Sequence, residues 1–353
     1  DREKARDVFA KALEKYPPAA EERQELHEYA ILLSRNQHFT ESLAVLNSLY
    51  IADQNDKSVI GDYIVVLNWS GNNRAALDIY EKHKSADMPT YVIASAAGAY
   101  YKLGDYKTAQ TLFHAAGAAG DRKSRIWEAQ SFYLMGDAKS GDSVYAALLK
   151  ENPNDIETLR SRATMLMMAR NYRDALAEFE KVLAATAGAP NADEVRKAVD
   201  YDMAIAYIRV NEESKAIEKL KPYIDNGTAD VFMQSDYILA LRLAREYKKA
   251  IAEALRLWPD HGQVPVFGLQ AMADSYVRSG DVKRAIPIYE HILRRDANAN
   301  AAKLGLAFAR MMAGDIVGGA KVYNELLASD NPMLHPELLQ REIARLQAQE
   351  ATA

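Results

Sequence analysis

The sequence predicts an all-α fold, a right-handed superhelical solenoid built of tandem helix-turn-helix units. Two regularities predict it: a small residue recurs about every 34 positions along the 353 residues, and a large apolar residue follows it four positions later. Because one helix pair cannot bury its apolar face alone, such units stack on their neighbours and share a continuous core. The small marker residues are Ala5, Ser42, Ala76, Ala109, Gly141, Ala175, Ala216, Ala250, Ala285 and Gly319.

The large side chains after the markers support this phase. Four positions after each marker stand Phe9, Leu46, Tyr80, Phe113, Tyr145, Phe179, Leu220, Ala254, Tyr289 and Tyr323, of which only Ala254 is small. A period of about 34 residues with two helices per unit resembles the tetratricopeptide repeat family over nearly the whole chain. The resemblance implies a binding groove along the concave face that the first helices of the repeats form.

Glycine and proline punctuate the repeats at different places. The glycines stand where a first helix is predicted to end, a position where a left-handed backbone is favourable for glycine. The prolines follow second helices, where a missing N–H breaks no helical hydrogen bond. The glycines are Gly71, Gly104, Gly136, Gly280 and Gly314, and the prolines are Pro17, Pro153 and Pro332.

The repeat phase also divides the chain. The longest interval between markers holds a run of small and flexible residues, which predicts an elongated loop at 186–193 between two halves of the array. The chain begins at Asp1 without Met or a signal segment, and we expect it to be part of a longer protein. In order, the predicted segments are the second helix of a truncated repeat at 1–16, the first half at 17–185, the loop at 186–193, the second half at 194–333, and a C-terminal capping helix and tail at 334–353.

Composition excludes several functional classes. The 44 Lys and Arg against 49 Asp and Glu leave a formal charge of −5, which disfavours a nucleic-acid partner. The absence of Cys excludes disulfides, thiolate metal sites and a cysteine nucleophile. The seven His lack metal-ligand spacing, no catalytic motif is present, and no apolar run is long enough for a membrane span. We therefore expect no enzymatic activity, no cofactor and no metal.

Aromatic residues are the first candidates for binding. Offsets taken from the family place Trp69, Tyr101 and Tyr133 along the concave face of three consecutive repeats, where they could stack as a ladder on sugar rings or grip a peptide. The alternative is that they pack between neighbouring repeats. The same offsets also select Tyr91, Trp127, Tyr201, Phe232, Phe267 and Phe308.

Carboxylates are the second candidates. Asp62, Asp202, Asp236 and Asp274 fall on the same predicted face, as do Glu28 and Glu157, and together they would favour a cationic ligand. The alternative is mutual ion pairing with nearby cations, each pair contributing little to stability. Those cations are Arg35, Lys102, Arg160, Arg209, Arg242 and Arg278.

A narrower resemblance covers about 45 residues. Residues 62–71, 75–81 and 96–105 look like the periplasmic repeat region of the outer-membrane exporter of poly-β-1,6-N-acetyl-D-glucosamine. The resemblance implies a non-enzymatic periplasmic scaffold, associated with the outer membrane in the full-length protein. It also implies a partner polysaccharide deacetylase and a cationic, partly deacetylated polysaccharide as the guided polymer.

Two other functions remain open at this stage. One is a protein–protein adaptor, periplasmic or cytoplasmic, that binds a peptide in its concave groove. The other is a helical regulatory region attached to a catalytic domain elsewhere in the protein.

Overall fold

The structure, a computed structural model, describes residues 20–188 and 190–327, and within these ranges every regular element is a helix. The 18 described helices confirm the predicted all-α fold of paired helices. The chain forms two compact units, Asp1–Asn171 and Tyr172–Ala353, which we call unit 1 and unit 2.

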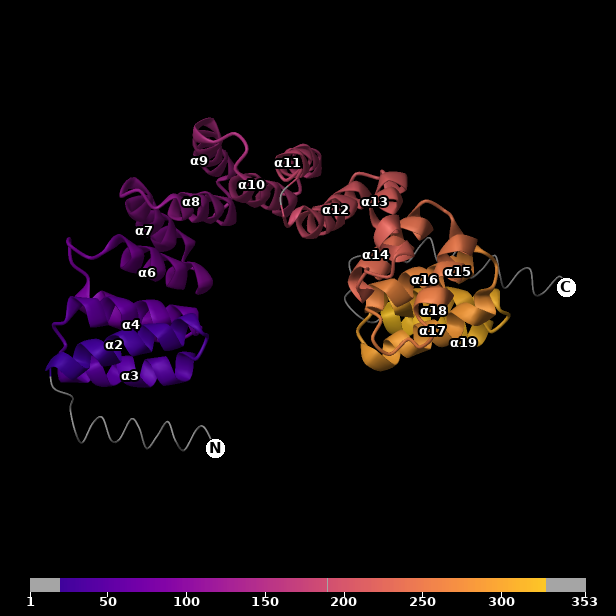
Figure 1. Ribbon diagram of the computed structural model, residues 1–353. Helices are drawn as coiled ribbons and strands as arrows, with labels where there is room; N and C mark the ends of the chain where they lie inside the picture. The colour runs from indigo at the N-terminus through magenta and orange to yellow at the C-terminus, as the bar shows by residue number, and fades with distance from the viewer. Residues whose placement is uncertain (1–19, 189, 328–353) are drawn as a thin grey trace. The chain divides into compact units, whose positions relative to one another are not determined.

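Unit 1 is a stack of helix pairs. Each first helix packs on its own second helix, and that second helix packs on the next first helix in the pairs up to α9 (Figure 1). Its described helices are α2 (Ala20–Arg35), α3 (Phe39–Ala52), α4 (Lys57–Trp69), α5 (Asn73–His83), α6 (Thr90–Lys102), α7 (Tyr106–Ala118), α8 (Arg122–Leu134), α9 (Ala138–Glu151) and α10 (Ile156–Met168).

Unit 2 repeats the same packing. First helices also contact one another here, α14 with α16 and α16 with α18, so their exposed faces form one surface. Its described helices are α11 (Tyr172–Ala185), α12 (Ala192–Arg209), α13 (Glu213–Asp225), α14 (Val231–Leu243), α15 (Tyr247–Leu257), α16 (Val266–Arg278), α17 (Val282–Arg295), α18 (Asn300–Met312) and α19 (Ile316–Leu327).

A left-handed residue ends each first helix. The five glycines predicted at this turn all have positive φ, between 84° at Gly136 and 94° at Gly314. The remaining four turns use a residue with a side chain, at φ values from 59° to 64°, which is less favourable than glycine. Those four residues are Gln37, Arg170, Asn211 and Arg245.

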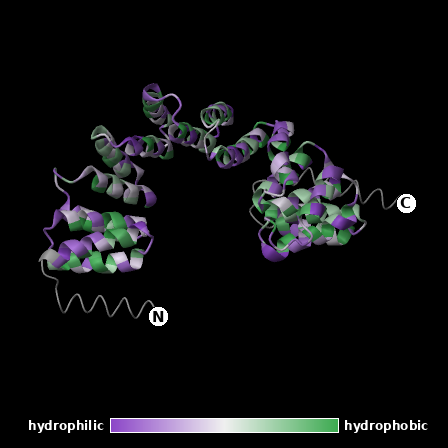
Figure 2. Cartoon of the chain, in the orientation of Figure 1, coloured by the Kyte–Doolittle hydropathy of each residue, from purple (hydrophilic) through white to green (hydrophobic). Residues whose placement is uncertain are grey.

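The repeat phase predicts the core correctly. All described marker residues are buried, as are all nine described residues four positions after them. Tyr145, Tyr289 and Tyr323 are each no more than 1% exposed, so single aromatic rings fill the space inside their helix pairs. Figure 2 shows hydrophobic and hydrophilic residues mixed along individual helices of both units, as expected of helices that bury one face.

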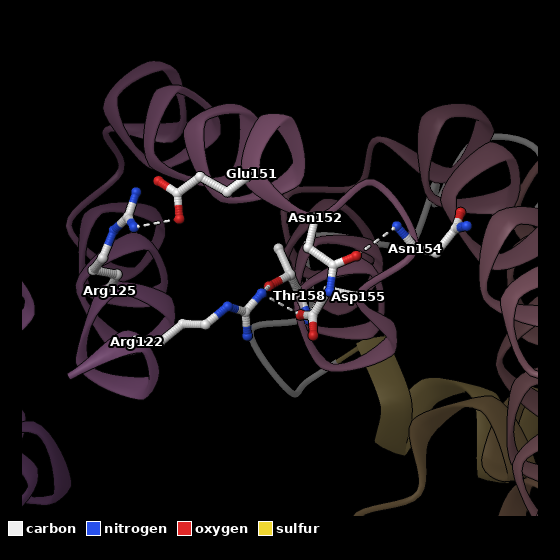
Figure 3. Close-up of polar contacts among 7 residues, drawn as sticks. All are labelled: Arg122, Arg125, Glu151, Asn152, Asn154, Asp155 and Thr158. Carbon is white, nitrogen blue, oxygen red and sulfur yellow. Dashed lines mark hydrogen bonds and ion pairs between the residues drawn. The ribbon is translucent and has the colours of Figure 1, made fainter. Parts of the chain in front are cut away.

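Polar contacts fix the starts of α8 and α10 within unit 1 (Figure 3). Arg122 Nη2 lies 2.6 Å from Asp155 Oδ2 and donates to Thr158 Oγ1 at 2.9 Å. Asp155 is the N-cap residue of α10 and accepts a hydrogen bond from the Thr158 amide at 2.7 Å. Arg125 of α8 also pairs with Glu151 at the end of α9, at 2.8 Å. These bonds hold α8 in place, and α8 forms one wall of the groove described below.

Some of the predicted segments lie wholly or partly outside the described residues. The truncated repeat at 1–16 and the capping helix at 334–353 lie outside the described residues. The predicted loop at 186–193 lies between α11 and α12, which already begins at Ala192, and its role as a boundary between halves stays a prediction. Across the described part of the chain, no helix combines the length and apolarity that crossing a membrane requires.

Candidate binding grooves

A groove of about 620 Å³ crosses the first helices of unit 1. Small residues on α6, Ala94, Ser95 and Gly98, form part of its floor. Residues from α4 and α8 also line it, and we call it the aromatic groove. Its lining is Val65, Asn68, Trp69, Thr90, Tyr91, Ala94, Ser95, Gly98, Tyr101, Lys102, Phe113, Asp121, Lys123, Ser124 and Trp127.

The two tryptophans of this groove differ in how they are held. Trp127 is 42% exposed, and its ring lies 5.0 Å from the ring of Tyr101 and 6.1 Å from that of Phe113. Trp69, at the end of α4, is 53% exposed, and no aromatic ring of the described residues packs against it. Trp127 is thus held by its neighbours, whereas the indole of Trp69 remains available to a ligand.

The predicted ladder is only partly assembled here. Trp69 and Tyr101 line the same groove, but Tyr101 is half-buried, contacts Tyr106, and donates a hydrogen bond to Gln130 at 3.3 Å. Tyr101 therefore supports Trp127 more than it presents a free face.

Tyr133 lies outside the lining of the aromatic groove. Its ring is 6.2 Å from that of Tyr145, and a Cβ built on Gly141 would approach the Tyr133 ring to 2.5 Å. The marker glycine thus makes room for Tyr133 between α8 and α9. A binding role for Tyr133 stays a prediction.

The charged groups of the aromatic groove are mainly cationic. Lys102 Nζ donates to Asn68 Oδ1 at 2.7 Å and to the Asn68 carbonyl at 3.1 Å, and burial lowers the pKa of Lys102. Lys123 is exposed at the groove, while Asp121 accepts a hydrogen bond from Ser124 Oγ at 2.5 Å. Two ammonium groups therefore face one carboxylate.

The predicted carboxylate Asp62 joins three first helices of unit 1. Its Oδ2 lies 2.9 Å from His27 Nε2 on α2, and Tyr91 of α6 makes a hydrogen bond to it. Burial, followed by the neighbouring carboxylate, raises the pKa of Tyr91 to about 12, and the hydrogen bond to Asp62 raises the pKa of His27 above 6.5. Asp62 also borders a wider opening of about 1120 Å³, shared with Glu28.

The predicted carboxylates of unit 2 also make contacts between helices. Asp236 accepts a hydrogen bond from Tyr201 at 2.8 Å, and burial raises the pKa of Asp236. Asp202 is half-buried on α12.

Asp274 has the richest set of partners. Its Oδ1 accepts from Tyr289 at 2.7 Å and from Gln270 at 2.8 Å, while its Oδ2 lies 3.3 Å from Arg242 Nη1. Asp62, Asp236 and Asp274 are thus engaged in bonds within the fold. Their role in attracting a ligand stays a prediction.

A second groove, of about 670 Å³, lies over α16 and α18 in unit 2. Two arginines border it, and we call it the arginine groove. The family offsets select Arg278 and Phe308 in advance, but Met312 is not singled out, because an exposed Met at the end of a helix carries no sequence signal of its own. The lining is Arg242, Gln270, Asp274, Val277, Arg278, Tyr289, Ala301, Leu304, Gly305, Phe308 and Met312.

No group of three or more His, Asp or Glu side chains in the described part of the chain could hold a metal ion. Aromatic, apolar and cationic side chains predominate in the linings of both grooves.

Comparisons with known proteins agree with this architecture. Residues 271–333 match the model of the tetratricopeptide repeat family. The C-terminal part of a repeat protein of this kind from Cytophaga hutchinsonii shares the fold with a TM-score of 0.51, at 16% identity over 69% of this chain and 98% of its own. Residues 271–333 are thus similar to the tetratricopeptide repeat (TPR) family, and the described chain has a TPR-like fold. At this identity the likeness to the solved structure concerns the fold alone.

Two other solved structures are less similar. A TPR protein from Parabacteroides merdae is 14% identical over 82% of this chain and 99% of its own, with a TM-score of 0.46. YrrB, described as a TPR protein with an unusual peptide-binding site, is 20% identical over 57% of this chain and 97% of its own, with a TM-score of 0.40. No curated protein sequence matches this chain.

Proposed function

We propose that this TPR protein is a non-enzymatic adaptor that binds a segment of a partner protein in the aromatic groove of unit 1. The observation that carries the proposal is Trp69, a 53% exposed indole at the edge of a groove of about 620 Å³. Large aromatic side chains supply much contact area and lose little rotamer entropy, which makes them frequent hot spots of binding.

The shape of the groove suits one bulky apolar side chain of the partner. Ala94 and Gly98 keep the floor low, so a side chain can enter between Trp69 and Trp127. The Trp127 wall is rigid because Tyr101 and Phe113 hold its ring. A prearranged wall reduces the entropy that binding must overcome.

The charge of the groove favours an anionic ligand over a cationic one. Lys102 and Lys123 lie within it, and the hydroxyl of Ser124 already bonds its one lining carboxylate, Asp121. We expect acidic residues beside the apolar anchor of the partner segment.

The export of a partly deacetylated polysaccharide is the second candidate. The exposed face of Trp69 is its support, since a sugar ring can stack on an indole. The cationic polymer is disfavoured by Lys102 and Lys123. The periplasmic location and the deacetylase partner belong to this candidate and stay predictions.

One titration series separates the candidates. Intrinsic tryptophan fluorescence is measured while peptides with a central Phe, the same peptides with Ala in its place, and partly deacetylated glucosamine oligomers are added. We expect the Phe peptides to bind and Trp69→Ala to weaken them about thirtyfold, which is the loss of a binding hot spot. Phe232→Ala, an equally exposed aromatic on α14 of unit 2, is the matched control and should change nothing.

The contrary outcomes are distinct. Sugar oligomers that bind through Trp69 while the peptides do not would replace the adaptor with the export scaffold. Equal binding of the Phe and Ala peptides would remove the aromatic groove as the site.

A further inference from the structure

The arginine groove of unit 2 has an incompletely neutralised cationic edge. Asp274 is the one carboxylate in its lining, and both of its oxygens are occupied by Tyr289, Gln270 and Arg242. Arg278, exposed at the end of α16, forms no ion pair with any described carboxylate. The groove therefore carries one positive charge more than it neutralises.

The guanidinium of Arg242 is also incompletely satisfied. Its Nη1 lies 3.3 Å from Asp274, but its Nε is buried and has no hydrogen-bond partner among the described residues. A buried donor without an acceptor is unfavourable, so Asp274 alone does not satisfy the Arg242 guanidinium.

An apolar strip on α18 borders the cationic edge. Phe308 is half-buried, and Met312, in the last turn of the helix, is 53% exposed. Leu304 lines the groove beside them. A flexible methionine adapts to partners of different shape, which suits a binding surface.

We propose that the arginine groove is a second binding site, for a peptide segment in which an acidic side chain neighbours an aliphatic one. The carboxylate binds Arg278, and the aliphatic side chain lies on Phe308 and Met312. Charge complementarity selects this occupant, because a basic segment would face Arg278 and Arg242 with Asp274 already paired. The site lies in a different unit from the aromatic groove and does not depend on it.

The test follows the methyl group of Met312 by NMR on the full chain with labelled methionine methyls, its signal assigned with Met312→Leu. The probes are a short peptide of alternating Glu and Leu and the same peptide with Gln for each Glu. We expect the Glu peptide to shift the Met312 signal and to bind at least about tenfold more tightly than the Gln peptide. Added salt should weaken the Glu peptide more than the Gln peptide.

Single substitutions test which cation of the protein binds the Glu peptide. Arg278→Gln should weaken the Glu peptide about tenfold, since one charge-assisted contact is lost. Lys283→Gln removes one exposed cation from α17, outside the lining of the groove, and should leave binding unchanged. Trp69→Ala should leave it unchanged too, so that failure of the aromatic groove and failure of this site are distinguishable.

Three results would overturn the proposal. They are a Met312 signal that does not move, equal binding of the Glu and Gln peptides, and an Arg278→Gln variant that binds as the parent does.

Discussion

The two grooves are built from the same repeat positions and yet have different interiors. In the aromatic groove the polar groups at the floor are an amide and an ammonium, Asn68 with Lys102, and the walls are indoles. In the arginine groove a carboxylate, Asp274, ties together three side chains, and the walls are a phenyl ring and a methionine. The shared architecture therefore fixes where a groove lies, while a few side chains at those positions decide what it can bind.

The polar networks also differ in how much stability they carry. The Lys102 network in unit 1 joins the exposed Lys102 to the buried Asn68, so water can replace a lost bond at the ammonium. The Asp274 network in unit 2 includes the hydroxyl of Tyr289, whose residue is 1% exposed. Loss of its acceptor leaves a buried donor that water reaches poorly.

The largest effect is therefore expected at Asp274. Asp274→Ala should lower the free energy of unfolding of unit 2 by about 3 kcal/mol, because Tyr289 loses its acceptor and Arg242 loses its counter-charge. Hydrogen exchange, followed by mass spectrometry in α14, α16 and α18, measures it. Asp274→Asn, which keeps an acceptor oxygen, should recover part of the loss. Equal exchange in the Ala variant and the parent would show that the network is not stabilising.

Each groove has a glycine in its lining, Gly98 in the aromatic groove and Gly305 in the arginine groove, and substitution of these glycines gives the next comparison. A Cβ on Gly305 would lie 2.5 Å from the ring of buried Tyr289, whereas one on Gly98 would meet only the Asn68 side chain, at 3.1 Å. Gly305→Ala should destabilise unit 2 by about 2 kcal/mol through overpacking. Gly98→Ala should change unit 1 by less than about 1 kcal/mol, because alanine favours the helix and the amide can shift. Urea denaturation of both variants measures the difference, and equal losses would contradict it.

These glycines show what the sequence could and could not predict. The marker period predicts the helix pairs, the buried residues four positions later, and the left-handed turns at Gly71 and its counterparts, because each depends on local geometry and a repeated neighbour. It also selects the faces that carry Trp69 and Asp274. It cannot tell an exposed aromatic from a packed one, since Tyr101 and Tyr133 share one offset but meet different neighbours. The carboxylates are a further example, because sequence offsets give their positions but not the hydroxyl or guanidinium that each one meets.

A pH-dependent difference between the units is expected from His27. Its hydrogen bond with Asp62 raises the pKa of His27 in the folded state, and Asp56 and Glu28 add to the effect. The folded-state pKa lies above the unfolded value, so the stabilisation is complete below about pH 6.5 and is lost as the pH rises through the folded-state pKa. In His27→Gln the pH-dependent part should disappear.

The expected size is about 1 kcal/mol in unit 1, since the pair is only partly buried. Hydrogen exchange in α2 and α4, with rates corrected for the intrinsic effect of pH, measures it between pH 5 and pH 8. A stability of unit 1 that rises with pH over this range in the parent, and no longer does so in the variant, would have the wrong sign for this mechanism.

The smallest effect on stability is expected at Trp69, and it separates binding from folding within the aromatic groove. Trp69→Ala removes a half-exposed ring without an aromatic neighbour, so the free energy of unfolding of unit 1 should change by less than about 0.5 kcal/mol. Trp127→Ala removes a ring that packs on Tyr101 and Phe113, and should cost about 1.5 kcal/mol. Urea denaturation followed by circular dichroism compares them. If both variants lose the same stability, Trp69 is a packing residue like Trp127, and the exposed indole on which the proposed adaptor function rests has a structural explanation instead.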